Sequence, residues 1–252
     1  MATPNFNHCE PNQIFPEWIQ GKDFKPSTEP MDVKCILFDL DGTLFDTADA
    51  IRRAVEETKT AFNLTIDVDQ VINESLNVLE GRKSKLNFLI IAFHFHFFSW
   101  KNPFRIFRIK QFFEDRFITY TREGILFPGV AEALRALSRY RLAVVTSRER
   151  MWAENALQKH ELLSYFEVMV TTDDVEKDKP HPAPLQKAVS LMQVDPCECL
   201  YVGDLPSDIR AGKRTGVHTA AILTGLSPRD RLAEEHPDYI FENLEDLIHT
   251  LQ

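Results

Sequence analysis

The chain has 252 residues, 44% of them hydrophobic, and a formal net charge of -9 at pH 7. This length and apolar content suit one α/β domain with an insertion, or two small domains. The negative charge argues against a dominant surface for nucleic acid or anionic membranes, and no basic-then-apolar leader is evident, so we expect a cytoplasmic protein.

The amino-terminal segment 1–32 is polar and rich in Pro, Asn and charged residues, and we expect it to form an extension of the folded domain. The first apolar run follows and ends at Phe38, which predicts a buried strand. We expect a helix over 47–62, because apolar residues recur there at helical spacing and Asp46 or Thr47 can cap it.

Residues 47–126 have helical patterns without intervening strands. Their most apolar stretch, at 86–100, has Phe-His-Phe-His-Phe-Phe at its centre. At about 15 residues it is short for a membrane span, so we interpret it as a buried helix. A surface for self-association or for docking a partner or an apolar substrate is the alternative. Metal binding by His94 and His96 would lack a third ligand.

Beyond residue 127, apolar runs alternate with amphipathic helical stretches. This pattern predicts a parallel sheet with right-handed crossovers and helices on both faces, a Rossmann-like doubly wound α/β fold. The expected strands cover 142–146, 166–171, 200–202, 219–223 and 239–241, and the main helices cover 130–137, 149–159, 183–192, 207–215 and a last stretch from 244.

Two acidic residues follow the first predicted strand, in Phe38-Asp39-Leu40-Asp41-Gly42-Thr43. Open α/β sheets bind ligands at the carboxyl ends of their strands, so these carboxylates are placed for chemistry. Asp39 and Asp41 would lie close enough to perturb each other's ionisation and to share a divalent cation. A surface acidic turn is the simpler alternative.

Three later segments fit the same picture: Val-Val-Thr-Ser at 144–147, Asp-Lys-Pro-His-Pro at 178–182, and Tyr-Val-Gly-Asp-Leu-Pro-Ser-Asp at 201–208. Together with the first segment, and in this order, they resemble the four signatures of the haloacid dehalogenase (HAD) superfamily. The nearest group is the phosphoglycolate-phosphatase-like and β-phosphoglucomutase-like one. The resemblance implies a core domain from 33–46 and 127–252, with an α-helical cap domain inserted at 47–126.

The resemblance also implies residue roles for phosphoryl transfer. Asp39 would attack phosphorus and form an aspartyl phosphate, while Asp41 would act as general acid and then as general base. Thr146 would bind the phosphate through its hydroxyl, with Ser147 as the competing choice. Lys179 would neutralise phosphate and carboxylate charge; a solvated surface lysine is the alternative.

The implied metal is Mg²⁺, because the ligands would all be oxygens: Asp39, the main-chain carbonyl of Asp41, Asp204 and waters. Asp208 lies one helical turn after Asp204 and would order a metal-bound water or the lysine. Capping of the helix amino end is the structural alternative for both acids.

Further substrate contacts are expected from Gly42 and Thr43 beside the acidic pair. Arg82 lies where the cap reaches the active site in related phosphatases, and could bind an anionic leaving group; a solvated helix position is the alternative.

These inferences predict a Mg²⁺-dependent phosphatase that hydrolyses a small phosphorylated metabolite, a phosphate monoester, through an aspartyl-phosphate intermediate. Two alternatives remain: a β-phosphoglucomutase-like phosphomutase, which would share the core residues, and a non-catalytic HAD-fold binding protein.

Overall fold

The computed structural model describes residues 32–68 and 103–251. The extension at 1–32, apart from its last residue, lies outside this range. So do Arg82 and the aromatic stretch 86–100.

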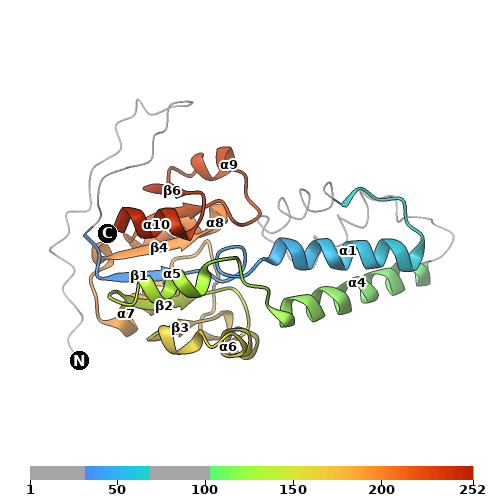
Figure 1. Cartoon of the computed structure of the whole chain (residues 1–252), viewed down its shortest axis with the longest axis horizontal. Helices are drawn as coiled ribbons and strands as arrows, with labels where there is room; N and C mark the ends of the chain where they lie inside the picture. Colours follow the sequence, from blue (N-terminus) through green and yellow to red (C-terminus); the bar gives the residue numbers. More distant parts are fainter. Residues whose placement is uncertain (1–31, 69–102, 252) are drawn as a thin grey trace.

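A six-stranded parallel sheet forms the centre of the molecule, with strand order β3-β2-β1-β4-β5-β6 (Figure 1). The chain runs outward from β1 to β3 and then crosses back to β4, so the order reverses between β1 and β4. Ligands bind at such a switch point. The doubly wound prediction is confirmed. The strands are β1 Cys35–Phe38, β2 Arg141–Val145, β3 Val168–Val170, β4 Cys199–Gly203, β5 His218–Ile222 and β6 Tyr239–Phe241.

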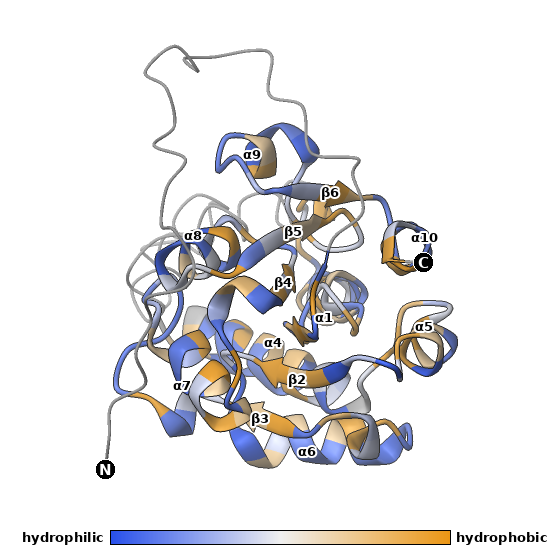
Figure 2. Cartoon of the chain, turned by 90° about the vertical axis from the view of Figure 1, so that its left-hand side faces the viewer, coloured by the Kyte–Doolittle hydropathy of each residue, from blue (hydrophilic) through white to orange (hydrophobic). Residues whose placement is uncertain are grey.

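Helices cover both faces of the sheet (Figure 2). Ile36 and Phe38 of β1 face one apolar cluster, which includes residues of α5, α6 and α10. Cys35 and Leu37 face the other, with residues of α7 and α8, as the two-residue period of a buried strand requires. The helices beside the sheet are α5 Val130–Ala136, α6 Arg150–Lys159, α7 Ala183–Met192, α8 Pro206–Thr215, α9 Arg229–Ala233 and α10 Leu244–Leu251.

Within the described residues, three short 3₁₀ helices lie in the connections, at Leu163–Tyr165, Thr172–Asp174 and Pro196–Glu198. The first two lie on either side of β3. The strand expected at 166–171 is shorter at both ends, and it spans only Val168–Val170.

Two long helices, α1 Thr47–Phe62 and α4 Pro103–Glu123, lie side by side and extend beyond the sheet (Figure 1). Asp46 caps α1, since its Oδ1 accepts a hydrogen bond from the Asp49 backbone N at 2.9 Å. The capping prediction is thus confirmed for Asp46. The apolar faces of the pair meet around Val55, Phe113 and their neighbours.

The two chain passages that join this helix pair to the sheet run next to each other. Phe45 and Leu126 form a β-bridge, and the Asp46 backbone N donates to the Ile125 carbonyl at 2.7 Å. Within residues 32–68 and 103–251, no helix has both the length and the apolar character needed to span a membrane.

Candidate active site

The predicted site residues follow three neighbouring strands. Phe38 of β1 pairs with Val144 of β2 and Val202 of β4, so the residues just beyond these strands meet at one edge. Asp39 is fixed there by its backbone N, which donates to the Val202 carbonyl at 2.9 Å.

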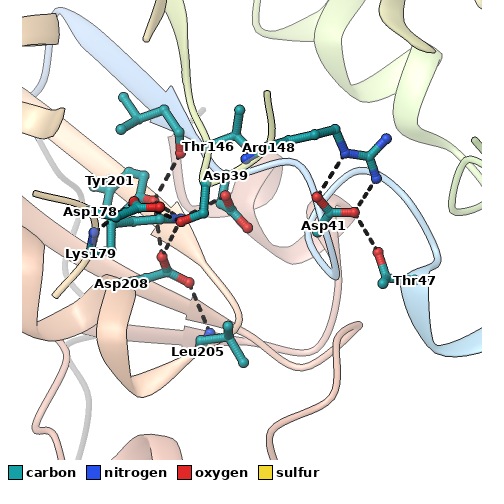
Figure 3. A network of polar contacts seen from close by, with 12 residues as sticks. Asp39, Asp41, Thr47, Thr146, Arg148, Asp178, Lys179, Tyr201, Leu205 and Asp208 are labelled. Atoms are coloured by element: carbon teal, nitrogen blue, oxygen red, sulfur yellow. Dashed lines mark hydrogen bonds and ion pairs between the residues drawn. The ribbon is translucent and has the colours of Figure 1, made fainter. Parts of the chain in front are cut away.

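A buried lysine joins Asp39, which follows β1, to Asp208 in the first turn of α8 (Figure 3). The Lys179 Nζ lies 2.7 Å from Asp39 Oδ1 and 2.7 Å from Asp208 Oδ1, and it also donates to the Tyr201 hydroxyl at 3.0 Å. Its side chain is 5% exposed. Burial alone would lower the pKa of Lys179, but Asp208 and Asp39 raise it well above the usual value, so the ammonium stays charged. Lys177, by contrast, is exposed.

Asp39 is a poorly solvated carboxyl group. Burial raises its pKa to about 7, and the charges of Asp208 and Asp41 act in the same direction, while Lys179 opposes them. Within the described chain its Oδ1 accepts from Lys179 and its Oδ2 accepts no hydrogen bond. One oxygen of Asp39 is therefore left without a hydrogen bond from the residues that the structure describes.

Asp204 is the second carboxyl group with an unused oxygen. Its Oδ2 accepts from the Leu226 backbone N at 3.1 Å, whereas its buried Oδ1 has no hydrogen-bond partner among the residues described. Burial raises the pKa of Asp204 well above its usual value, and Asp208 and Asp39 add to that shift.

Two glycines let the backbone approach this carboxylate. A Cβ on Gly42, which has φ +83°, would lie 2.2 Å from Asp204 Oδ2, and a Cβ on Gly225 would lie 2.0 Å from it. Either would displace the carboxylate, so close packing on Asp204 requires glycine at both positions.

The acids fit a divalent cation. Asp39, Asp204 and Asp208 each bring a carboxylate oxygen within 4.8 Å of the others. A buried, unpartnered oxygen on Asp204 is costly without a ligand, and a hard cation would satisfy it. Asp208 fits direct ligation less well, because its Oδ1 meets Lys179 and Tyr201 and its Oδ2 accepts from the Leu205 backbone N at 3.0 Å.

Asp41 faces a different set of partners from Asp39 (Figure 3). Its Oδ1 accepts from the Thr47 hydroxyl at 2.7 Å and from Arg148 Nη2, and its Oδ2 accepts from Arg148 Nε at 3.0 Å. Burial acts to raise the pKa of Asp41, but the charge and hydrogen bonds of Arg148 outweigh it and lower the pKa.

The two candidate hydroxyls have distinct surroundings. Thr146 is buried directly after β2, and its Oγ1 accepts from the Arg148 backbone N at 3.2 Å. Ser147 donates to Asp178 Oδ1 at 2.8 Å, and the same oxygen accepts from the Lys179 backbone N at 2.7 Å. Ser147 thus tethers the lysine loop.

Gly42 and Thr43 directly follow Asp41 in the chain. The Gly42 carbonyl accepts from the Thr224 hydroxyl at 2.9 Å. The Thr43 Oγ1 is buried and makes no hydrogen bond to any described residue.

The structure adds Arg148, Tyr201 and Thr47 to the residues singled out from the sequence. Arg148 lies two positions after Thr146. A basic residue in the loop after the second strand could therefore have been identified from the sequence as a candidate site residue. Tyr201 lies within β4, so its sequence position indicates only a buried aromatic residue of the core. Thr47 lies at the start of a predicted helix, so its position indicates only a helix terminus.

Comparison with known proteins identifies the family of this chain. Residues 36–222 match the family model of the haloacid dehalogenase-like hydrolases. A protein called pyrophosphatase PpaX from Oceanobacillus iheyensis is 31% identical over 86% of this chain and 96% of its own length. A PpaX from Bacillus cereus is 33% identical over 88% of this chain and 97% of its own.

Solved structures share the fold. One, described as a predicted phosphoglycolate phosphatase from Haemophilus somnus, has a TM-score of 0.70 and 25% identity, covering 88% of this chain and 99% of that one. Another, provisionally described as a β-phosphoglucomutase from Thermotoga maritima, has a TM-score of 0.69 and 22% identity, covering 87% and 98%.

The doubly wound sheet and the family match together define a class of hydrolases. The chain belongs to the haloacid dehalogenase-like hydrolases, and it is a hydrolase of the phosphatase class. The predicted superfamily and enzyme class are confirmed.

Proposed function

We propose that this protein is a Mg²⁺-dependent phosphohydrolase that acts on a small phosphorylated metabolite through an aspartyl phosphate on Asp39. One observation carries the proposal: Lys179 holds one oxygen of Asp39 at 2.7 Å, while the other oxygen is left free of hydrogen bonds from described residues. A carboxylate held in this way is oriented for attack on phosphorus.

The remaining roles follow from position. An oxygen of Asp39 bonds to phosphorus as the bond to the leaving oxygen breaks, and the leaving oxygen takes a proton from Asp41. Water then attacks phosphorus and gives a proton to Asp41. The bond between phosphorus and the Asp39 oxygen breaks, which regenerates the Asp39 carboxylate and releases phosphate. Thr146, Gly42 and Thr43 are proposed to contact the phosphoryl oxygens.

Mg²⁺ is proposed to bind Asp39, Asp204 and the Asp41 main-chain carbonyl. When bound, it would neutralise charge on the carboxylates and on the phosphoryl oxygens. Asp208 is assigned to positioning Lys179, since both of its oxygens already accept hydrogen bonds or an ion pair.

We further propose that residues 47–126 form a cap domain on a core of 33–46 and 127–252. The packing of α1 against α4 and the adjacent connections at Phe45 and Leu126 support this division. Arg82 in the cap stays a candidate contact for the leaving group. A cytoplasmic location and a docking role for segment 86–100 stay predictions.

Two substrate classes are proposed. A phosphate monoester follows from the resemblance to phosphoglycolate phosphatases, and inorganic pyrophosphate is favoured by the names of the PpaX relatives. A phosphomutase would use the same core residues, and isomerisation of a sugar phosphate without net phosphate release would identify it.

The first test is hydrolysis of p-nitrophenyl phosphate by wild type and Asp39→Asn, each with Mg²⁺ and with excess EDTA. We expect metal-dependent release of p-nitrophenol by wild type, and a fall of at least about 1,000-fold in the variant, because the attacking carboxylate is gone. Thermal unfolding of both proteins controls for the fold. Activity of Asp39→Asn comparable to wild type would remove Asp39 as the nucleophile.

A further inference from the structure

A buried arginine holds the candidate general acid in a bidentate grip. Arg148 Nε lies 3.0 Å from Asp41 Oδ2, and Nη2 contacts Asp41 Oδ1. The Arg148 Nη1 donates to the Thr121 carbonyl of α4 at 3.2 Å, and the guanidinium lies over the Phe45 ring at 5.7 Å from its centroid. Its side chain is 10% exposed, so the group is fixed in place and poorly solvated.

This grip conflicts with the role proposed for Asp41. Thr47 and Arg148 together occupy its carboxylate, which faces them rather than the Lys179–Asp39 pair (Figure 3). To protonate a leaving oxygen, Asp41 has to exchange these contacts for the substrate. Arg148 would then be a buried cation without its counter-ion, which is strongly unfavourable.

An anionic leaving group removes this penalty. The planar fork that grips a carboxylate also binds a phosphoryl group through two parallel hydrogen bonds. The anion would take the position of Asp41 on the guanidinium, next to the bridging oxygen that Asp41 protonates. In a phosphoanhydride the second phosphorus is bonded directly to that oxygen.

We propose that Arg148 binds the second phosphoryl group of a phosphoanhydride such as inorganic pyrophosphate, in exchange for Asp41. This inference rests on the proposed function and adds its leaving-group specificity. Once it has left Arg148, the Asp41 carboxylate takes up a proton from water. As the bond from Asp39 to phosphorus forms, the bridging bond breaks, its electron pair goes to the bridging oxygen, and that oxygen takes this proton from Asp41. The departing orthophosphate stays paired with Arg148.

The backbone supports this placement, because Arg148 belongs to the loop that carries the phosphate-binding hydroxyl. Its backbone N donates to Thr146 Oγ1 at 3.2 Å. A single loop would thus contact the transferred phosphoryl group through Thr146 and the departing one through Arg148.

The test compares kcat/KM for inorganic pyrophosphate and for p-nitrophenyl phosphate, whose leaving group lacks a second phosphoryl group. In Arg148→Met we expect kcat/KM to fall about 100-fold for pyrophosphate and less than about 10-fold for p-nitrophenyl phosphate, since only the former loses a bidentate charged contact. Arg148→Lys keeps the charge without the fork and should give an intermediate ratio. Arg150→Met, two residues further on at the start of α6 and paired with Asp174 and Glu154, is the matched control and should leave the ratio unchanged.

A second measurement applies if Arg148→Met shows no measurable hydrolysis of pyrophosphate. Methylenediphosphonate, which is not hydrolysed, should inhibit p-nitrophenyl phosphate hydrolysis by wild type with an inhibition constant about 10-fold or more below that of Arg148→Met. If Arg148→Met does not fold, Arg148→Lys is judged by the same two criteria.

Equal losses on both substrates, or an unchanged inhibition constant, would overturn the inference. So would a wild-type enzyme that hydrolyses p-nitrophenyl phosphate but not pyrophosphate, which would leave the proposed function standing. Absence of metal-dependent hydrolysis of either substrate would instead count against the proposed function.

Discussion

The charges buried at the edge of the sheet do not balance. Asp39, Asp204 and Asp208 are each at most 3% exposed, and the ammonium of Lys179 is the cation that directly contacts two of them. Burial is the main reason that the pKa values of Asp39 and Asp204 are raised, and the neighbouring carboxylates add to the shift. A divalent cation would remove that surplus, so the residues themselves favour a metal.

Tyr201 belongs to this network although it lies inside β4. Its hydroxyl accepts from Lys179 at 3.0 Å and lies within reach of Asp208 Oδ1 at 3.1 Å and the Val145 carbonyl at 3.2 Å. The hydroxyl therefore helps to fix the direction in which the ammonium points.

Tyr201→Phe should lower the free energy of unfolding by about 1–2 kcal/mol, because buried hydrogen-bonding groups lose a partner. We also expect kcat to fall several-fold with little change in KM, since Lys179 is less well oriented. Denaturant unfolding and steady-state kinetics measure the two effects. Tyr165→Phe is the control, because its hydroxyl makes no hydrogen bond within the described part of the chain; an equal loss in both variants would contradict the role given to Tyr201.

At the scale of elements, α1 begins at Thr47, shortly after the loop that carries Asp39 and Asp41. Asp46 accepts a hydrogen bond from the Asp49 backbone N, and its own backbone N donates to the Ile125 carbonyl. Asp46 thus both caps α1 and joins the start of α1 to the segment that follows α4.

Asp46→Ala should cost about 1 kcal/mol of stability, the usual effect of losing a helix cap. The control is Asp195→Ala, because Asp195 precedes a 3₁₀ helix without a side-chain capping bond. Chemical denaturation of the two variants gives the comparison. A loss in Asp195→Ala as large as that in Asp46→Ala would show that the capping bond is not the cause.

The fold could be predicted from the sequence because buried parallel strands and amphipathic helices have strong, distinct patterns. α1 and α7 begin and end where the pattern indicates, while β3 spans only Val168–Val170, between two 3₁₀ helices. The grip of Arg148 on Asp41 could not be predicted. It joins residues 107 positions apart and depends on the path of a side chain between α4 and the Phe45 ring.

At the scale of the whole molecule, a single loop connects the acidic site to the helix pair. Thr224 donates to the Gly42 carbonyl, Gly225 packs under Asp204, and the Leu226 backbone N donates to Asp204 Oδ2. The Leu226 side chain packs against the apolar cluster of Ile51 and Val55 on α1. Any shift of Asp204 on binding a cation would therefore move Leu226, and with it the contact between this loop and α1.

Stability should accordingly depend on metal and pH together. The folded-state pKa of Asp39 is raised to about 7 and that of Asp204 is raised as well, so without metal the free energy of unfolding should fall as pH rises from about 4 towards 7 and beyond. Mg²⁺ competes with protons for these carboxylates, so its stabilising effect should grow over the same range. We expect saturating Mg²⁺ to raise Tm by several degrees more at pH 8 than at pH 6. Asp204→Asn should abolish most of that difference while Asp195→Asn leaves it intact; a Tm increase that is independent of pH, or unchanged in Asp204→Asn, would place the cation elsewhere.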